Sequence, residues 1–308
     1  MNRYEKIMAR IAKGETIMID GGTGTEIEKR GAAMIEGAWN AGGALTHPEI
    51  VRSVHEDYIR AGGELIITNT FSTSRYVLQD AGLGDQFESI NRRSVELALE
   101  ARENMGKPDV LVAGGITNIR HAGQWPEIED LAAAMEEQAA VLAATGVDLI
   151  ILEMMRYKEF TLATLEAARK TGLPVWVGFS VRPRETDGAM ALFGGESLED
   201  SLQAMKAQNV PLIFLMHSLV ENIDKGLDIV QAHWDGPIGV YAHSGRFALP
   251  NWIFDGVISE QDYCDLAVGW VNRGVQVIGG CCGIGVCHME TLHDTLAKSK
   301  TKNSILID

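Results

Sequence analysis

Two adjacent cysteines are the residues of this sequence whose spacing points most directly to chemistry. Cys281 and Cys282 lie in the stretch VIGGCCGIG, residues 277–285, and are half of the four cysteines in the chain. Neighbouring cysteines form a disulfide only with a strained backbone, and free cysteines are often buried as packing residues. The surrounding glycines favour a metal site instead, because a backbone that folds closely around an ion needs residues without a Cβ atom.

His217 is the candidate for a third ligand of the same metal ion. It ends the apolar run at 210–217, which we expect to be a strand, and the cysteines follow the run at 275–279. Two thiolates and one imidazole, with a fourth position open, form an arrangement in which proteins hold catalytic zinc. From the residues alone two other interpretations stay open: the cysteines as packing residues, and His217 as a half-buried histidine with satisfied hydrogen bonds.

Polar residues also end other apolar runs. Asp20 ends the first run and Glu153 the fourth, while Tyr241 and His243 lie at the end of the seventh. A carboxylate at the end of a buried strand is costly unless it meets a partner. We therefore expect Asp20 and Glu153 to receive a substrate ammonium group, with a local cap or salt bridge as the alternative for each.

Eight short apolar runs must position these residues. We expect strands at 16–20, 64–68, 110–115, 148–153, 174–180, 210–217, 238–242 and 275–279. Between them lie amphipathic stretches with apolar residues every three or four positions, such as 47–63, 130–146 and 261–274. The joint from helix to strand recurs as AGGELII, TGVDLII, TGLPVWV and RGVQVIG, with a glycine where the helix ends.

This alternation predicts an α/β protein with the (β/α)8 TIM-barrel fold, as a single domain over residues 1–308. A doubly wound sheet has the same alternation, although no G-x-G-x-x-G follows the first run. In a barrel the carboxyl ends of the strands meet at one face, so residues that end different runs share one site. The final segment, residues 298–308, is expected to be a loosely held tail or a docking segment.

The composition of the chain indicates which binding partners and which cellular compartment to expect. The formal net charge of −15 disfavours nucleic acid and anionic membrane surfaces, because both repel an acidic chain. No apolar run has the length of a membrane span, and the charged N-terminal segment has no apolar signal region. Four cysteines are too few for a disulfide scaffold, which favours a reducing cytoplasm. The oligomeric state stays open, a homo-oligomer included.

Four motifs together resemble one known family. DGGTGTE at 20–26, TNTFSTS at 68–74, the strand-ending Glu153 and the GGCCG at 279–283 are similar to those of the zinc-dependent homocysteine S-methyltransferases. That family includes betaine- and S-methylmethionine-using enzymes and the homocysteine module of cobalamin-dependent methionine synthase. The resemblance runs from residue 17 to residue 296, and GGCC is its most specific element.

The resemblance implies a (β/α)8 barrel that holds zinc through three cysteines. Two of these fall on Cys281 and Cys282, whereas the third falls on His217, so this chain departs from the family at one ligand. Zinc accepts two cysteines and a histidine as readily as three cysteines. The charge changes, because three thiolates make the zinc site negative and two thiolates with a neutral imidazole leave it neutral. We expect a bound thiol to have a lower pKa there, and its thiolate to be less nucleophilic.

The resemblance also implies an activity, the transfer of a methyl group from an activated donor to the thiol of homocysteine, which gives methionine. Asp20 and Glu153 would contact the amino end of homocysteine and Tyr241 would orient the site, and we take these three as the catalytic residues. The expected substrate-binding residues are Asp20, Gly21, Gly22, Thr23, Asn69, Thr70 and Glu153.

The donor is less well defined by the motifs. Betaine-using relatives place aromatic residues near the positions of Ser72 and Met154, and neither residue is aromatic here. The expected donor is therefore a sulfonium like S-methylmethionine, or a corrinoid-bound methyl group that a separate protein delivers. Two alternatives are a zinc-dependent hydrolase with His243 as general base and a metal-free family member that binds an amino acid or a corrinoid protein.

The remaining cysteines and two loop tryptophans are expected to have other roles. Cys264 lies in an amphipathic stretch and is expected to be a packing residue. Cys287 and His288 are expected to begin the last helix, outside the metal site. Trp39 and Trp125 lie in loop-like stretches, where packing and lining of the donor's approach are both open.

Overall fold

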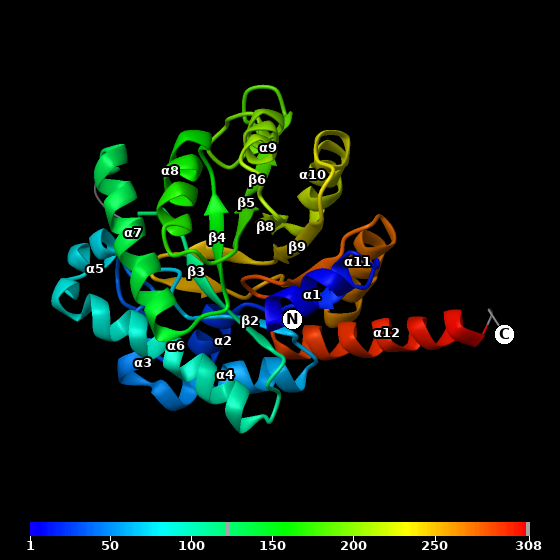
Figure 1. Ribbon diagram of the computed structural model, residues 1–308, viewed down its shortest axis with the longest axis horizontal. Helices are drawn as coiled ribbons and strands as arrows, with labels where there is room; N and C mark the ends of the chain where they lie inside the picture. Colours follow the sequence, from blue (N-terminus) through cyan, green and yellow to red (C-terminus); the bar gives the residue numbers. More distant parts are fainter. Residues whose placement is uncertain (121–123, 306–308) are drawn as a thin grey trace.

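The chain folds into a (β/α)8 barrel, in which helices surround eight parallel strands (Figure 1). This structure is a computed structural model that describes residues 1–120 and 124–305, with side chains up to residue 298. The ring closes where Ile19 of the first strand bridges to Leu65 of the second. The backbone amide of Glu64 donates to the Met18 carbonyl at 2.8 Å beside this bridge. The barrel prediction is confirmed, and a doubly wound sheet is excluded because its edge strands would not pair.

The eight barrel strands coincide with the eight apolar runs, with ends that shift by a few residues. In order of hydrogen-bonded neighbours they are β1 (Ile17–Met18), β12 (Val277–Gly280), β9 (Ile238–His243), β8 (Ile213–Leu219), β5 (Val175–Phe179), β4 (Leu149–Met155), β3 (Leu111–Ile116) and β2 (Leu65–Ile67).

Two small hairpins were not predicted from the sequence. They are β6 (Val181–Pro183) with β7 (Met190–Leu192), and β10 (Arg246–Ala248) with β11 (Asn251–Ile253). Each follows a barrel strand directly, β5 and β9 respectively, so both lie at the carboxyl face of the barrel. Their strands are only three residues long, which is too short for a reliable alternation of apolar and polar residues.

The expected helices 47–63, 130–146 and 261–274 are present as α4, α7 and α11. The helices are α1 (Arg3–Ile11), α2 (Thr23–Lys29), α3 (Gly43–Thr46), α4 (Pro48–Arg60), α5 (Arg75–Asp80), the 3-10 turn η1 (Gly84–Gln86), α6 (Phe87–Asn104), α7 (Ile128–Thr145), α8 (Lys158–Arg169), α9 (Leu198–Ala207), α10 (Val220–His233), α11 (Glu260–Asn272) and α12 (Val286–Ile305). At the four repeated helix-to-strand joints the glycine has a positive φ, which stops the helix at low steric cost: Gly62, Gly146, Gly172 and Gly274.

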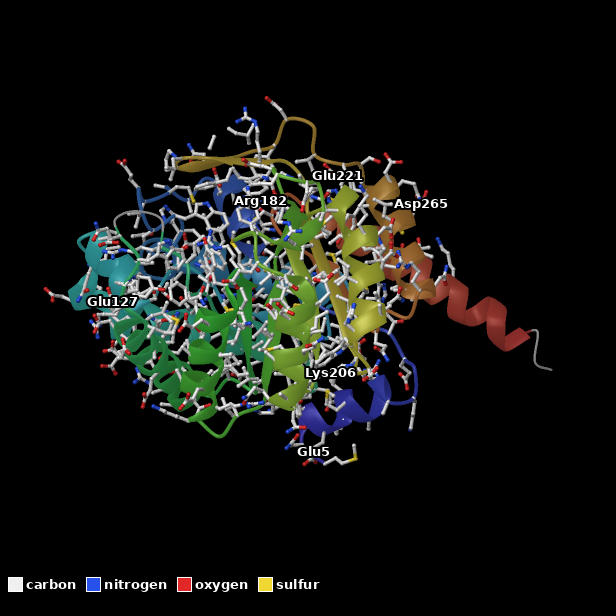
Figure 2. All side chains as sticks on the ribbon, turned by 90° about the horizontal axis from the view of Figure 1, so that it is seen from above. Glu5, Glu127, Arg182, Lys206, Glu221 and Asp265 are labelled. Atoms are coloured by element: carbon white, nitrogen blue, oxygen red, sulfur yellow. The ribbon has the colours of Figure 1, made fainter. Side chains whose placement is uncertain are left out.

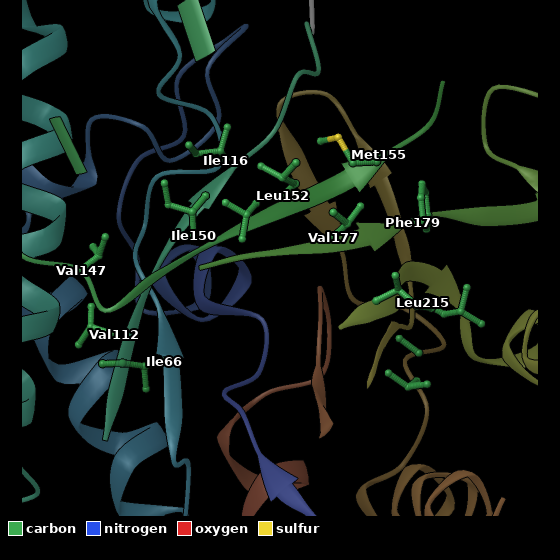
Figure 3. Close-up of a cluster of buried hydrophobic side chains, with 14 of the residues drawn as sticks. Ile66, Val112, Ile116, Val147, Ile150, Leu152, Met155, Val177, Phe179 and Leu215 are labelled. Atoms are coloured by element: carbon green, nitrogen blue, oxygen red, sulfur yellow. The ribbon is translucent and has the colours of Figure 1, made fainter. Parts of the chain in front are cut away.

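Alternate residues of each strand face two separate cores. Ile66, Val112 and Ile150 point outward and pack with the helices (Figure 3). Their neighbours Leu65 and Leu111 point inward and fill the barrel together with residues such as Trp176 and Phe214. The period of two in burial is what a barrel strand requires, since one face meets helices and the other meets opposing strands.

Helix α1 closes the amino end of the barrel. Ile7 and Ile11 belong to the inner core, and the Trp176 indole donates to the Tyr4 hydroxyl at 3.2 Å. Figure 2 places Glu5 on this helix at one end of the molecule, and Arg182, which follows β5, toward the opposite end. The carboxyl face, where the polar residues gather, is therefore the end that α1 leaves open.

The last helix extends beyond the barrel (Figure 1). The expected tail at 298–308 is helical as far as Ile305, as part of α12, and residues 306–308 lie outside the described residues. Among the described helices, none combines the length and the apolar character that crossing a membrane requires.

Candidate metal centre and active site

The structure brings the three candidate metal ligands together at the carboxyl face. His217 lies on β8, and Cys281 and Cys282 follow β12. His217 Nδ1 is 3.5 Å from Cys281 Sγ, and the two sulfur atoms are 3.9 Å apart. The ligand atoms of all three residues lie within 4.8 Å of one another. Both cysteines are free thiols, since a disulfide would bring the sulfur atoms to about 2.05 Å.

Two of these separations, those that involve Cys281, are close to the values of a tetrahedral zinc site. Zinc bonds of about 2.3 Å to sulfur and about 2.05 Å to nitrogen place two sulfur ligands about 3.8 Å apart, and a sulfur and a nitrogen about 3.6 Å apart. The observed values are 3.9 Å and 3.5 Å. The residues therefore fit a zinc ion with three protein ligands, and the fourth tetrahedral position would face the cavity that they line.

Burial sets the protonation of this cluster. It lowers the pKa of His217 well below its usual range, so the imidazole is neutral and has a lone pair for a metal. The hydrogen bond with Cys281, together with burial, raises the pKa of the Cys282 thiol well above its usual value. A divalent cation bound among these groups would lower the pKa of the Cys282 thiol again, because it stabilises the thiolate form.

Irregular backbone turns two site residues toward the cavity. His217 has a φ of 42° and Met154 a φ of 56°, values that non-glycine residues seldom adopt. The pairing register shifts at the same places, between Met216 and Leu219 on β8 and between Leu152 and Met155 on β4. Bulges of this kind redirect side chains near active sites.

The cysteine turn is fastened to the end of β9. The Cys281 amide donates to the Ala242 carbonyl at 2.8 Å, and the Ser244 amide donates to the Cys282 carbonyl at 3.0 Å. Gly283 has a φ of 81°, and a Cβ atom at this position would collide with the Ser244 carbonyl. The glycine expected beside the cysteines is thus required for the turn that presents them.

Two carboxylates lie in the same cavity. Asp20 Oδ2 accepts a hydrogen bond of 2.7 Å from the Ile67 amide, and Glu153 Oε1 accepts one of 3.4 Å from the Tyr241 hydroxyl. Burial raises the pKa of Asp20 well above its usual value, and the neighbouring Glu153 raises it further. Burial raises the pKa of Glu153 to about 8. Two acids that resist ionisation form a receptor for a cation, because a bound ammonium group restores their charged forms.

The cavity that contains these groups has a volume of about 300 Å³. This volume is at the small end of the range of ligand sites. Ten residues predicted for the site line it, namely Asp20, Gly21, Gly22, Thr23, Asn69, Glu153, His217, Tyr241, Cys281 and Cys282.

Thr70 differs from the prediction that it contacts substrate. Its side chain is fully buried and does not line the cavity. The hydroxyl donates to the Gly115 carbonyl at 2.7 Å and lies 2.7 Å from the Thr68 hydroxyl. The Thr70 amide donates to the Thr68 carbonyl at 2.8 Å, so the chain turns tightly here, and Asn69 lines the cavity while Thr70 fastens the loop behind it.

His243 is poorly placed for the general base of a hydrolase. Its ring packs against His217 with centroids 4.5 Å apart, and it is not among the residues that line the cavity. Burial lowers the pKa of His243 to about 4. This imidazole packs against the ring of His217 and is a weak base at neutral pH.

Several cavity residues were missed in the sequence analysis. Phe71 follows β2, Phe193 follows β7, and Phe247 and Trp252 belong to the hairpin β10–β11. Arg156, just beyond β4, also lines the cavity. Their common signal was a position shortly after a barrel strand, but the hairpins that bring the aromatic rings inward were not expected.

The residues expected to lie outside the site mostly do so. Cys264 is buried in the outer core, and His288 near the start of α12 lies 3.0 Å from the Ile258 carbonyl oxygen. Cys287 is exposed. Trp39 lines the cavity, whereas Trp125 stacks on Phe160 outside it with ring centroids 5.5 Å apart.

Comparison with known proteins is consistent with this site. Residues 17–296 match the family model described as homocysteine S-methyltransferase. The chain is 28% identical to homocysteine S-methyltransferase 2 from Zea mays, over 96% of this chain and 94% of that protein. It is 26% identical to S-methylmethionine–homocysteine S-methyltransferase BHMT2 from Pongo abelii, over 96% and 82% respectively.

A solved structure supports the fold. The homocysteine methyltransferase MmuM from Escherichia coli, in its metallated form, superposes with a TM-score of 0.77. The superposition covers 93% of this chain and 98% of that one, at 24% sequence identity. The similarity in fold therefore extends over the whole barrel.

Proposed function

Because the chain belongs to the homocysteine S-methyltransferase family and is a methyltransferase, we propose that it uses zinc to transfer a methyl group from a small sulfonium compound to homocysteine. The observation that carries this proposal is the joint presence, in one cavity, of a triad with zinc spacing and two acids suited to an ammonium group. Homocysteine has a thiol for the first and an ammonium for the second.

The chain's residues have distinct tasks in this reaction. Asp20 and Glu153 bind the ammonium of homocysteine, and the Tyr241 hydroxyl holds the Glu153 carboxylate in position. The backbone at residues 21–23 and the side chain of Asn69 line the remainder of the amino-acid subsite. These contacts hold the sulfur of homocysteine at the triad, so that positioning contributes much of the rate enhancement.

A zinc ion held by His217, Cys281 and Cys282 would supply the Lewis acidity that lowers the pKa of a thiol toward neutral pH. The thiol proton leaves to solvent, and the thiolate attacks the methyl carbon in line with the bond to the sulfonium. A new carbon–sulfur bond forms, and the old bond breaks with its electron pair left on the donor sulfur. The products are methionine and a neutral thioether.

Aromatic rings in the outer part of the cavity support an onium donor. Trp39 and Phe71 have ring centroids 6.5 Å apart, and Phe247 lies 6.4 Å from Trp39 and 6.5 Å from Trp252. Aromatic faces attract a positively charged sulfonium or ammonium group. Both Phe247 and Trp252 belong to the hairpin β10–β11, so that hairpin forms part of the donor side.

The first test measures metal content and product in the same preparations. We expect about one zinc per chain, and methionine from homocysteine with S-methylmethionine. His217→Ala and Cys281→Ala should each lose the metal and lower the rate at least about 100-fold, because a three-ligand site does not survive the loss of one ligand. Cys287→Ser is the matched control, since that thiol is exposed and outside the triad.

Each alternative outcome has a definite meaning. Protein without zinc, or His217→Ala protein with full zinc, contradicts the proposed metal site. Methyl transfer from methylcobalamin but not from S-methylmethionine replaces the sulfonium donor by a corrinoid. Transfer from betaine at an equal rate extends the donor to quaternary ammonium compounds.

A further inference from the structure

Arg156 is a cavity residue to which the reaction described above assigns no task. It lies immediately after β4, three positions beyond Glu153, and lines the cavity. Its guanidinium carbon is 5.0 Å from the centre of the Trp125 ring and 5.9 Å from that of Tyr157. The rings hold the guanidinium group on one side and leave its hydrogen-bond donors to find partners elsewhere.

Those partners are missing from the described part of the chain. Nε of Arg156 is buried and has no hydrogen-bond acceptor, and no described carboxylate forms an ion pair with this residue. Arg102, another arginine that is largely withdrawn from solvent, is by contrast paired with Asp148 at 2.9 Å. A buried guanidinium donor without an acceptor is costly, which indicates that a ligand supplies the acceptor.

The position of Arg156 indicates which substrate it serves. Glu153 lies within β4, whereas Arg156 follows the last residue of that strand, so Arg156 lies farther toward the carboxyl face of the barrel. The neighbouring Trp125 is 36% exposed, which places the guanidinium group near the mouth of the cavity. Homocysteine occupies the inner end, between the acids and the triad. The carboxylate of homocysteine is one carbon from its ammonium and stays at that depth.

We propose that Arg156 binds the carboxylate of the methyl donor and thereby sets the orientation of the donor in the cavity. This inference rests on the proposed methyl transfer. The onium group lies against the aromatic rings, with its methyl carbon toward the triad, and the carboxylate extends outward to Arg156. A guanidinium group matches a carboxylate with two parallel hydrogen bonds, which specifies orientation as well as charge.

Binding and kinetics of two matched donors test the assignment. The donors are S-methylmethionine and its methyl ester, which lacks the carboxylate charge and has one additional methyl group. For the parent protein we expect the ester to bind about 10- to 100-fold more weakly, as is usual for the loss of a charge-assisted hydrogen bond. Arg156→Gln should weaken binding of S-methylmethionine by the same factor and leave binding of the ester unchanged. In turnover, the KM for the donor should rise while the KM for homocysteine stays constant.

Arg182→Gln is the matched control. Arg182 also stacks on an aromatic ring, 4.4 Å from the centre of Phe193, but it is exposed and does not line the cavity. It should behave like the parent with both donors. Zinc content and melting temperature of both variants verify that the barrel is intact.

The outcomes separate this inference from the proposed function. Equal binding of acid and ester by the parent, or binding of neither, overturns the inference. A raised KM for homocysteine instead of the donor assigns Arg156 to the acceptor and also overturns it. Binding that depends on Arg156, titrated by calorimetry without homocysteine, supports the inference even if no methionine forms, in which case only the proposed reaction fails.

Discussion

Each of the two cavity acids lowers the stability of the empty protein and favours the binding of a cation. Glu153 is buried beside Asp20, and its ionised form has the Tyr241 hydroxyl as hydrogen-bond donor at a long 3.4 Å. No described lysine or arginine forms an ion pair with either acid. Burial of these acids without a positive partner lowers the stability of the fold until a cation binds beside them. Such acids therefore indicate a binding site.

A glutamine at position 153 should reveal this cost through its pH dependence. The pKa of Glu153 is about 8 in the fold and about 4.3 in an unfolded chain, so the folded state binds more protons between these pH values. Stability of the parent therefore falls as the pH rises through this interval. In chelator-treated protein, Glu153→Gln should be close to the parent at pH 4 and exceed it by about 5 kcal/mol at pH 9.

Thermal melts of both proteins across this pH range provide the measurement. The variant should also lose affinity for homocysteine, since it no longer supplies the negative charge. A melting-temperature difference that does not change with pH would show that Glu153 is already ionised at neutral pH in the empty cavity.

At the scale of elements, α1 and the two hairpins define the ends of the barrel. Helix α1 fills the amino end with Ile7 and Ile11, which pack with the inner residues of the strands. At the other end, the hairpin β10–β11 contributes aromatic residues to the cavity wall. One end thus contributes mainly packing and the other contributes specificity, a division common to barrels of this type.

Ile11→Ala should separate these two contributions. Ile11 is only 1% exposed, so its truncation should lower the free energy of unfolding by about 2–4 kcal/mol, from lost burial and a residual cavity. Zinc content and kcat/KM at 20–25 °C should stay at parental values, because α1 does not reach the carboxyl face. Chemical denaturation provides the first quantity. Lys13→Ala, at an exposed position just after α1, is the control and should change neither.

An activity loss in Ile11→Ala protein that remains folded would contradict this division between the ends. It would show that a change of packing at the amino end alters the cavity through the inner core of the barrel.

For the molecule as a whole, the proposed metal site would connect distant parts of the sequence. The ligands His217 and Cys281 are 64 positions apart and lie on β8 and beyond β12, with β9 between these strands. A metal bound only by the folded chain stabilises it by mass action. The net charge of −15 acts in the opposite direction, through self-repulsion within the compact state.

Metal removal should therefore lower the melting temperature of the parent by several degrees, which corresponds to about 2–4 kcal/mol of binding free energy at excess metal. Differential scanning calorimetry with and without chelator measures the change. Cys281→Ser should melt at the chelated temperature in both conditions, and Cys287→Ser should respond like the parent. Equal responses of Cys281→Ser and the parent would place the stabilising metal elsewhere.

The barrel and most of the residues of the candidate site follow from the hydrophobic pattern of the chain and from its motifs. Eight apolar runs with glycine-terminated helices define a (β/α)8 alternation, and the carboxyl ends of parallel strands must meet. Asp20, Glu153, His217 and the cysteine pair were therefore predicted as neighbours, and the structure places them in one cavity. Buried strands and the residues that end them can be predicted in this way, because both depend on the local hydrophobic pattern.

The directions of individual side chains depend on non-local contacts that are visible only in the folded structure. The positive φ of His217, the inward turn of Thr70 and the hairpin aromatic residues depend on contacts between strands far apart in the sequence. Arg156 is the clearest example. Its buried Nε has no hydrogen-bond partner among the described residues, and this follows from the residues around it in space and not from its neighbours in the sequence. The physical reason is that a bulge of one residue reverses which face a side chain occupies, and non-local packing determines where bulges form.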